Sequence, residues 1–343
     1  MNNRVYINYI SSFLPNAPVD NEHIEDVLGM VDGKRSRSCK IVLKNNGIKA
    51  RHYAVDPVTG KFTHNNAKMT SQAVTTLLEK SGKTLEEIDC LACGTSSPDQ
   101  IQPAHGHMVQ GELKLPPCEV VTTAGVCISG MSAMKYAYMS VASGLSKHAV
   151  ATGSEFVSSC MKASNFETET EAQVNSLKKK SSLAFEKDFL RWMLSDGAAA
   201  ALITDQPNND GLTLAIDWIE NISYSGDLPV CMYAGGVKKD DGSFQGMREV
   251  DDPYVILKEH YLSLKQDARI LEKHIMPQSA VALASIVNKR NFNVDDITWF
   301  LPHYSSQFFR PRLHDALVEK GVGIPYEKWF TNLHDKGNVG AAS

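Results

Sequence analysis

The sequence lacks the features that mark membrane and secreted proteins. No apolar run approaches the roughly 20 residues that a membrane span needs. The opening residues, MNNRVYINYISSFLP, contain no basic segment followed by an apolar one. The seven cysteines are an odd number scattered over 343 residues, a pattern that predicts free thiols and no disulfide framework. We therefore expect a cytoplasmic protein that makes no membrane contact.

An excess of positive charge is also missing. The formal net charge is -4, so nothing attracts the chain broadly to nucleic acid, and we expect no nucleic-acid partner. There is no Pro/Gly/Ser-rich linker either, although the chain is longer than a usual single domain. Its composition, 43% hydrophobic and 22% charged, is that of an ordinary globular protein. Two closely packed halves are the expected organisation.

A helix-then-strand pattern occurs twice in the chain. Residues 71–95 and 279–303 share it, and Ile88 of the first corresponds to Ile297 of the second at an offset of 209 residues. Each unit leads to a helical stretch and then to a glycine-containing turn. Aligning the turns places Cys127 opposite Asn338, at an offset of 211 residues. This repetition predicts an α/β protein with mostly parallel sheets covered by helices, and both turns at the carboxyl ends of strands, where ligands bind.

The repeat divides the chain into residues 1–206 and residues 207–343. The first half carries a polar insertion at 157–190, which we expect to cap a site or to form a dimer contact. It also contains two apolar segments, 148–155 and 198–204, that have no counterpart in the second half. We therefore expect the second half to be truncated, and the native protein to continue beyond Ser343 with a helix and two strands.

Three residues at corresponding ends of the repeated elements are candidates for chemistry. Cys127 opens a predicted helix, where unpaired amides favour a thiolate and can bind an oxyanion. His303 follows the expected strand 297–301, and Asn338 lies between two glycines at the second turn. Each has a plainer interpretation: a buried cysteine in a turn, a histidine that caps a helix, and an ordinary asparagine cap. Their related positions favour a shared active site.

Other clusters are weaker. Cys90 and Cys93 have the spacing of metal ligands, but they lie in an apolar strand and no second pair follows. His105 and His107 lie on different faces of a predicted helix. We expect no metal and no cofactor.

Together these motifs resemble the β-ketoacyl-acyl-carrier-protein synthase III group of the thiolase superfamily. The resemblance extends over most of the chain. It is carried by Asn46-Gly47-Ile48-Lys49-Ala50-Arg51, Ala124-Gly125-Val126-Cys127-Ile128-Ser129-Gly130, Ser195-Asp196-Gly197-Ala198-Ala199-Ala200, Pro302-His303 and Gly337-Asn338-Val339-Gly340-Ala341-Ala342-Ser343. It implies a thiolase-like fold with a layered α-β-α-β-α architecture, a homodimer, and acyl transfer in two steps. Cys127 would carry the acyl group, and His303 and Asn338 would stabilise the enolate of a second thioester in a Claisen condensation.

The departures from the family pattern concern the substrate. Residues 41–45 lack the tryptophan and arginine that clamp coenzyme A in the family, which favours an acyl-carrier-protein thioester over acyl-CoA. The pocket loop 97–103 is one residue longer and more polar than its counterpart in the family, where an aromatic residue usually limits the acyl pocket, so we expect Gln102 to bind substrate. Residues 13–20 and 45–48 look more like the dialkylresorcinol branch, which joins two β-ketoacyl units. The alternatives are fatty-acid initiation from acetyl-CoA and malonyl-carrier protein, and a noncatalytic subunit of a heterodimeric synthase.

Overall fold

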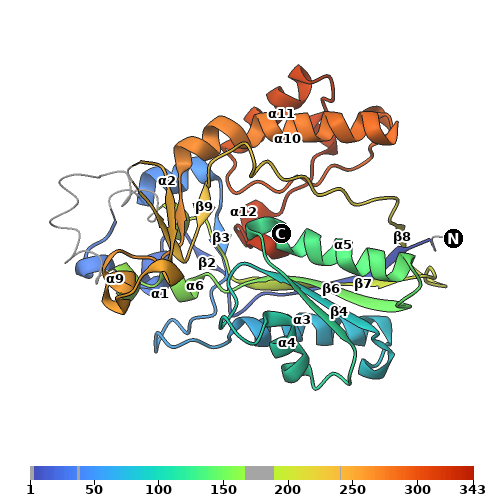
Figure 1. The fold of residues 1–343 in the computed structure, drawn as a ribbon, viewed down its shortest axis with the longest axis horizontal. Helices are drawn as coiled ribbons and strands as arrows, with labels where there is room; N and C mark the ends of the chain where they lie inside the picture. The colour runs from blue at the N-terminus through green and yellow to red at the C-terminus, as the bar shows by residue number, and fades with distance from the viewer. Residues whose placement is uncertain (1–3, 37–38, 167–188, 240) are drawn as a thin grey trace.

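The computed structural model describes residues 4–36, 39–166, 189–239 and 241–343 (Figure 1). The strands are β1 (Tyr6–Phe13), β2 (Val19–Asp20), β3 (Ala50–Arg51), β4 (Cys90–Thr95), β5 (Glu119–Thr123), β6 (His148–Glu155), β7 (Gly197–Thr204), β8 (Leu214–Ala215), β9 (Met232–Tyr233), β10 (Gly236–Lys238), β11 (Phe244–Gly246) and β12 (Lys265–Gln266). The α-helices are α1 (Ile24–Leu28), α2 (Cys39–Asn46), α3 (Asn66–Ser81), α4 (His105–Leu113), α5 (Ser129–Ala142), α6 (Ser158–Met161), α9 (Pro253–Lys258), α10 (Ala268–Arg290), α11 (Phe309–Glu319) and α12 (Leu333–Lys336). Most of the insertion predicted at 157–190 lies outside the described residues.

One six-stranded sheet organises the first half, in the order β5-β4-β6-β7-β1-β8. β4 is parallel to β5 and to β6, but β7 is antiparallel to both β6 and β1, and β8 is antiparallel to β1. The expectation of a mostly parallel sheet is therefore wrong here, because three of the five strand pairs are antiparallel. The cause is that strands covered on both faces are apolar throughout, so their sequence does not reveal their direction.

Helices cover both faces of this sheet. Leu91 of β4 packs in a cluster with Val74 of α3, whereas its neighbour Ala92 packs in a different cluster with Ala137 of α5. Because successive side chains of a strand point to opposite faces, α3 and α5 lie on opposite sides. Figure 1 shows α3 and α4 below the sheet and α5 above it. The carboxyl ends of β4, β5 and β6 point toward the side where the C-terminal segment packs.

The structure repeats at the offset found in the sequence. Gly82 and Asn291, 209 residues apart, both cap their helices, α3 and α10, in the left-handed conformation. The isolated parallel bridge Phe300↔Trp329 matches the Leu91↔Val120 pair of β4 and β5 at the same offset. The two halves thus share local elements at equivalent positions.

The second half differs from its expected form at 297–301. This segment was predicted to be a strand, but only Phe300 is bridged, and its neighbours Trp299 and Leu301 are 64% and 66% exposed. Among the described residues only the Trp329 segment pairs with it, so the ladder does not extend into a strand. α10 and α11 pack together on the far side of α5 (Figure 1). In the described part of the chain, no helix combines the length and the apolar character needed to cross a bilayer.

Candidate active site

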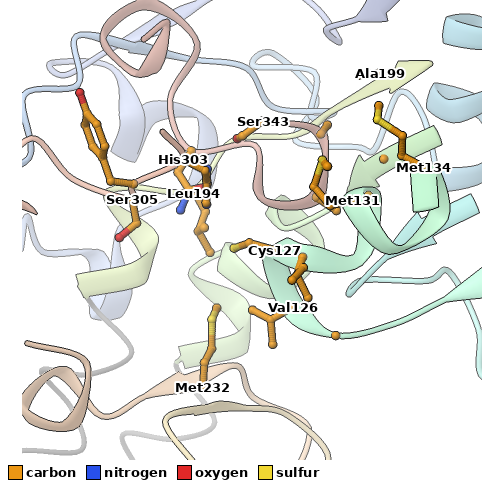
Figure 2. A pocket seen from close by; sticks show the side chains of 18 of the residues that line it. Val126, Cys127, Met131, Met134, Leu194, Ala199, Met232, His303, Ser305 and Ser343 are labelled. Carbon is orange, nitrogen blue, oxygen red and sulfur yellow. The ribbon is translucent and has the colours of Figure 1, made fainter. Parts of the chain in front are cut away.

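Cys127, His303 and Asn338 line a single cavity of about 650 Å³. In Figure 2 the Cys127 sulfur faces the side of the cavity from which Leu194 and His303 enter. The walls are otherwise largely apolar, and they include Met131, Met134, Leu194, Leu271, Ile275, Met276 and Phe309. The structure therefore brings together three residues that lie up to 211 positions apart in the chain.

Cys127 sits in a tight turn between β5 and α5. The turn residue Val126 has φ +57°, a conformation that a β-branched residue adopts only under strain. Two side chains hold the turn: Ser129 Oγ donates to the Val126 carbonyl at 2.6 Å, and Thr123 Oγ1 donates to the Ser129 carbonyl at 2.8 Å. The α-helix begins at Ser129, so Cys127 lies in the 3-10 turn that precedes it. This geometry presents the thiol to the cavity.

The environment of Cys127 does not support the predicted thiolate. Burial raises the pKa of Cys127 to about 12, and the nearby carboxylate of Glu155 raises it further. Desolvation and a like charge both disfavour the anion, and here they outweigh the backbone amides of the turn. Cys127 is therefore a neutral thiol at pH 7. Its proton must leave while the sulfur attacks.

His303 lies six residues before the start of α11 and lines the cavity. Desolvation by the cavity walls lowers the pKa of His303 below its ordinary value of 6.5. The imidazole is therefore neutral at pH 7, with one nitrogen able to accept a proton and the other able to donate. A neutral histidine in the same cavity as a neutral thiol can serve as the proton acceptor for that thiol.

Asn338 is 3% exposed and is fixed by backbone and side-chain contacts. Its backbone amide donates to the Met193 carbonyl at 3.0 Å, and its carbonyl accepts from the Ser195 amide at 2.8 Å. Its Oδ1 accepts from the Gly340 amide at 2.9 Å, which agrees with the plainer interpretation of Asn338 as a cap. Since Oδ1 is engaged, Nδ2 is the side-chain atom that can donate to a ligand in the cavity. The residue can cap the turn and bind a substrate oxygen at the same time.

The sequence analysis did not identify Glu155, which ends β6 beside this site. Its side chain is 1% exposed and accepts hydrogen bonds from both Ser96 and Ser97. Desolvation raises the pKa of Glu155, and hydrogen bonds from its neighbours oppose that effect. One feature of the sequence could have identified Glu155: it is an acidic residue at the end of an apolar strand. Charged residues are rarely fully buried without a reason.

Gln102 does not reach this cavity. Its side chain is exposed, and it is not among the residues that line the site. The loop that carries it leads from β4 into α4, which covers the sheet face opposite α5. Within one chain Gln102 therefore lies apart from this cavity, and its contact with substrate stays a prediction.

The candidate metal ligands have other environments. Burial raises the pKa of Cys90 and of Cys93 to about 12, so both are neutral thiols. His105 is buried, its Nε2 lies 3.3 Å from Thr70 Oγ1 and 3.2 Å from Ser154 Oγ, and burial lowers its pKa to about 4. His107 is exposed. The described residues contain no group of three or more His, Cys, Asp or Glu side chains placed to hold a metal ion.

The chain is similar to known proteins along almost its whole length. The N-terminal domain model of thiolase matches residues 48–191. The β-ketoacyl-[acyl-carrier-protein] synthase III of Clostridium perfringens is 24% identical over 331 residues, which are 96% of this chain and 85% of the relative. The enzyme of the same name from Hyphomonas neptunium is 24% identical over 100% of this chain and 88% of its own.

Solved structures show the same fold. The synthase III of Pseudomonas aeruginosa has a TM-score of 0.69 with 15% identity, over 99% of this chain and 86% of its own. AbyA1, a tetronic acid condensing enzyme, has a TM-score of 0.68 with 20% identity, over 98% and 88%. A variant of OleA from Xanthomonas campestris has a TM-score of 0.61 with 17% identity, over 99% and 86%. The expected thiolase-like fold is thus confirmed.

Proposed function

Because the chain is a β-ketoacyl synthase III-like acyltransferase of the thiolase superfamily, we propose that Cys127, His303 and Asn338 are its catalytic residues in a Claisen condensation of acyl thioesters. One observation carries this assignment. The three side chains come from related segments of a repeated unit, and they line one cavity. Cys, His and Asn in one cavity supply a nucleophile, a proton acceptor and a hydrogen-bond donor.

The first step is the transfer of an acyl group to Cys127. The sulfur attacks the thioester carbonyl, the new carbon–sulfur bond forms, and the carrier thiol leaves. Because Cys127 is a neutral thiol, its proton passes to His303 during the attack and then to the departing sulfur. The neutral state of His303 at pH 7 suits this role.

The second step joins two carbons. A second thioester binds with its carbonyl oxygen at His303 and at Nδ2 of Asn338, whose hydrogen bonds stabilise the enolate that forms when the α-carbon becomes a nucleophile. That carbon attacks the acyl group on Cys127, and the sulfur leaves. The proton that the α-carbon loses when the enolate forms ends on the Cys127 sulfur as the carbon–sulfur bond breaks, so the product carries a new carbon–carbon bond and the free thiol is regenerated.

We further propose that the substrates are β-ketoacyl-carrier-protein units and that the product enters dialkylresorcinol-type secondary metabolism. The apolar cavity walls suit aliphatic acyl chains, and residues 41–45, at the middle of α2, offer neither tryptophan nor arginine for a nucleotide. Carrier-protein thioesters place the reaction in the cytoplasm. The similarity to a tetronic acid condensing enzyme and to OleA supports condensation beyond fatty-acid initiation.

A homodimer is the proposed assembly. β5, which leads to Cys127, is an edge strand of the six-stranded sheet, so its outer side has free backbone groups. An edge strand of this kind is a template for pairing with a second chain. Pairing of β5 with its copy would form one continuous sheet behind the two Cys127 turns.

The test is to incubate the purified protein with a panel of acyl-carrier-protein thioesters and acetyl-CoA, and to measure intact mass and products. We expect an acyl adduct from carrier thioesters that is absent in Cys127→Ala and retained in Cys160→Ala, a matched variant at another accessible thiol. A fully acylated Cys127→Ala protein would overturn the assignment. Efficient acetylation from acetyl-CoA would instead favour fatty-acid initiation.

A further inference from the structure

Glu155 connects separate parts of the proposed active site. Ser96 Oγ donates to its Oε1 at 2.7 Å, and Ser97 Oγ donates to its Oε2 at 2.5 Å. The Ala341 amide, from the segment 337–343 that we call the Asn338 loop, donates to Oε1 at 3.3 Å. One buried carboxyl group thus joins the end of β4 to the Asn338 loop.

The directions of these hydrogen bonds favour the ionised carboxylate. The Phe156 amide donates to Ser97 Oγ at 2.7 Å, so the Ser97 hydroxyl hydrogen is free to point at Glu155. Backbone amides and hydroxyls that converge on both oxygens can offset part of the cost of burying the charge. In the described part of the chain, Glu155 forms no ion pair, so this charge lacks a cationic partner at contact distance.

The Asn338 loop is closely packed against Glu155. A Cβ added to Gly340 would lie 2.7 Å from Glu155 Cγ, and Gly340 has φ +55°. On its other side, the Ala341 carbonyl lies against Gly130 of α5 and Gly153 of β6. The loop that holds Asn338 is therefore packed directly against Glu155, and a shorter side chain at residue 155 removes a contact that holds it.

We propose that Glu155 is a positioning residue that fixes the Asn338 loop to the end of β4 and beside the nucleophile turn. This inference rests on the proposed function of the site. The titratable groups that interact with Glu155 are Cys127 and Cys160, and the Glu155 charge raises the pKa of both. A thiol with a raised pKa would resist adventitious alkylation and oxidation.

Two substitutions separate the roles of shape and charge. Glu155→Gln keeps the length and removes the charge, whereas Glu155→Asp keeps the charge and shortens the side chain. For Gln we expect the pH profile of Cys127 alkylation by iodoacetamide, read by peptide mass spectrometry, to move to lower pH. The rate at pH 8 should rise about threefold or more, as expected when a like charge is removed. For Asp we expect an unchanged alkylation profile and a condensation rate at least tenfold lower, with acylation of Cys127 retained.

Glu87→Gln is the matched control. Glu87 precedes the start of β4, whereas Ser96 and Ser97 follow its end, and Lys83 Nζ lies 2.7 Å from Glu87 Oε1. This variant should leave both readouts unchanged. Thermal unfolding checks that each variant is folded. If a Glu155 variant fails to fold, Ser97→Ala removes one of the hydrogen bonds that hold the Glu155 carboxylate. A Glu155→Asp protein that condenses as fast as the wild type would overturn the inference, and an alkylation profile of Glu155→Gln that matches the wild type would show that the Glu155 charge does not govern Cys127. If the wild-type Cys127 takes no acyl group, the proposed function fails instead, and the alkylation result still stands.

Discussion

Asn338 pairs with Leu194 across the two halves of the protein, through a parallel bridge with hydrogen bonds of 3.0 and 2.8 Å on either side of Leu194. Leu194 immediately precedes the Ser195-Asp196-Gly197 turn into β7. The residue proposed to bind the second substrate is therefore fixed to the sheet that positions the nucleophile. This relationship makes the donor group of Asn338 a rigid part of the site.

Asn338→Asp tests the donor directly. The Asp side chain keeps the oxygen that accepts from Gly340 at 2.9 Å, but it loses the Nδ2 hydrogens. We expect Cys127 to be acylated normally while the condensation rate falls about 100- to 1000-fold, the usual effect of removing one oxyanion donor. Single-turnover acylation and product formation are to be measured separately. An equal loss in both steps would contradict the proposed role.

Gly130→Ala tests the contact between α5 and the Asn338 loop. A Cβ at residue 130 would lie 2.1 Å from the Ala341 carbonyl oxygen, so the loop must move. A displacement of about 1 Å can cost roughly 100-fold in rate, and we expect a condensation loss of that order. Gly111→Ala in α4 is the control, since its added Cβ meets nothing within 4 Å. If both variants condense equally well, the contact does not position Asn338.

Much of this arrangement could be predicted from the sequence. Ile88 and Ile297 hold corresponding positions in the repeat, 209 residues apart, and the helix caps Gly82 and Asn291 have the same spacing. Turn residues and hydrophobic periodicity are local signals, so they can be recognised without knowing the tertiary contacts. The meeting of Cys127 and Asn338 in one cavity followed from that repeat.

The properties that depend on three-dimensional burial could not be predicted. A helix start suggested a thiolate at Cys127, but the walls of the cavity and Glu155 raise its pKa, and neither is adjacent in sequence. The segment 297–301 has the composition of a strand, yet strand formation also requires partners along its length. Pairing partners and desolvation are non-local, which is why these two expectations were wrong.

The pH dependence of condensation should report on His303. Its pKa lies below 6.5 because the cavity desolvates the charged form, and the proposed mechanism uses the neutral form. Activity should therefore remain on its plateau below the pH at which an ordinary histidine would protonate, and fall only as pH drops through the lowered pKa. Initial rates from pH 4.5 to 8 will show this midpoint. A midpoint above pH 6.5 would contradict the assignment to His303. The His303→Gln variant should not show this fall in rate at low pH.

Asp196 provides a prediction about stability. Burial raises the pKa of Asp196 from 3.8 to about 6, although its Oδ2 accepts from the Ala54 amide at 2.7 Å and from Ser158 Oγ at 2.5 Å. Its folded pKa lies above its unfolded value, so the folded protein binds more protons between these values and Asp196 makes stability fall as pH rises from about 4 to 6. The decrease from this group between pH 5 and pH 7 should be about 1 kcal/mol.

Asp196→Asn should remove that pH dependence and still weaken the fold. The amide of Asn would place donors against Ala54 or Ser158, both of which need an acceptor at Asp196, so we expect a loss of about 1–3 kcal/mol at pH 5. Urea unfolding of both proteins at pH 5 and pH 7 measures the difference. Asp56→Asn is the control, because hydrogen bonds from Thr59 and Val58 lower the pKa of that exposed carboxylate, so Asp56 affects stability only below about pH 4 and adds no trend between pH 5 and pH 7. An Asp196→Asn protein as stable as the wild type at pH 5 would show that the charge, and not the acceptor geometry, governs this buried site.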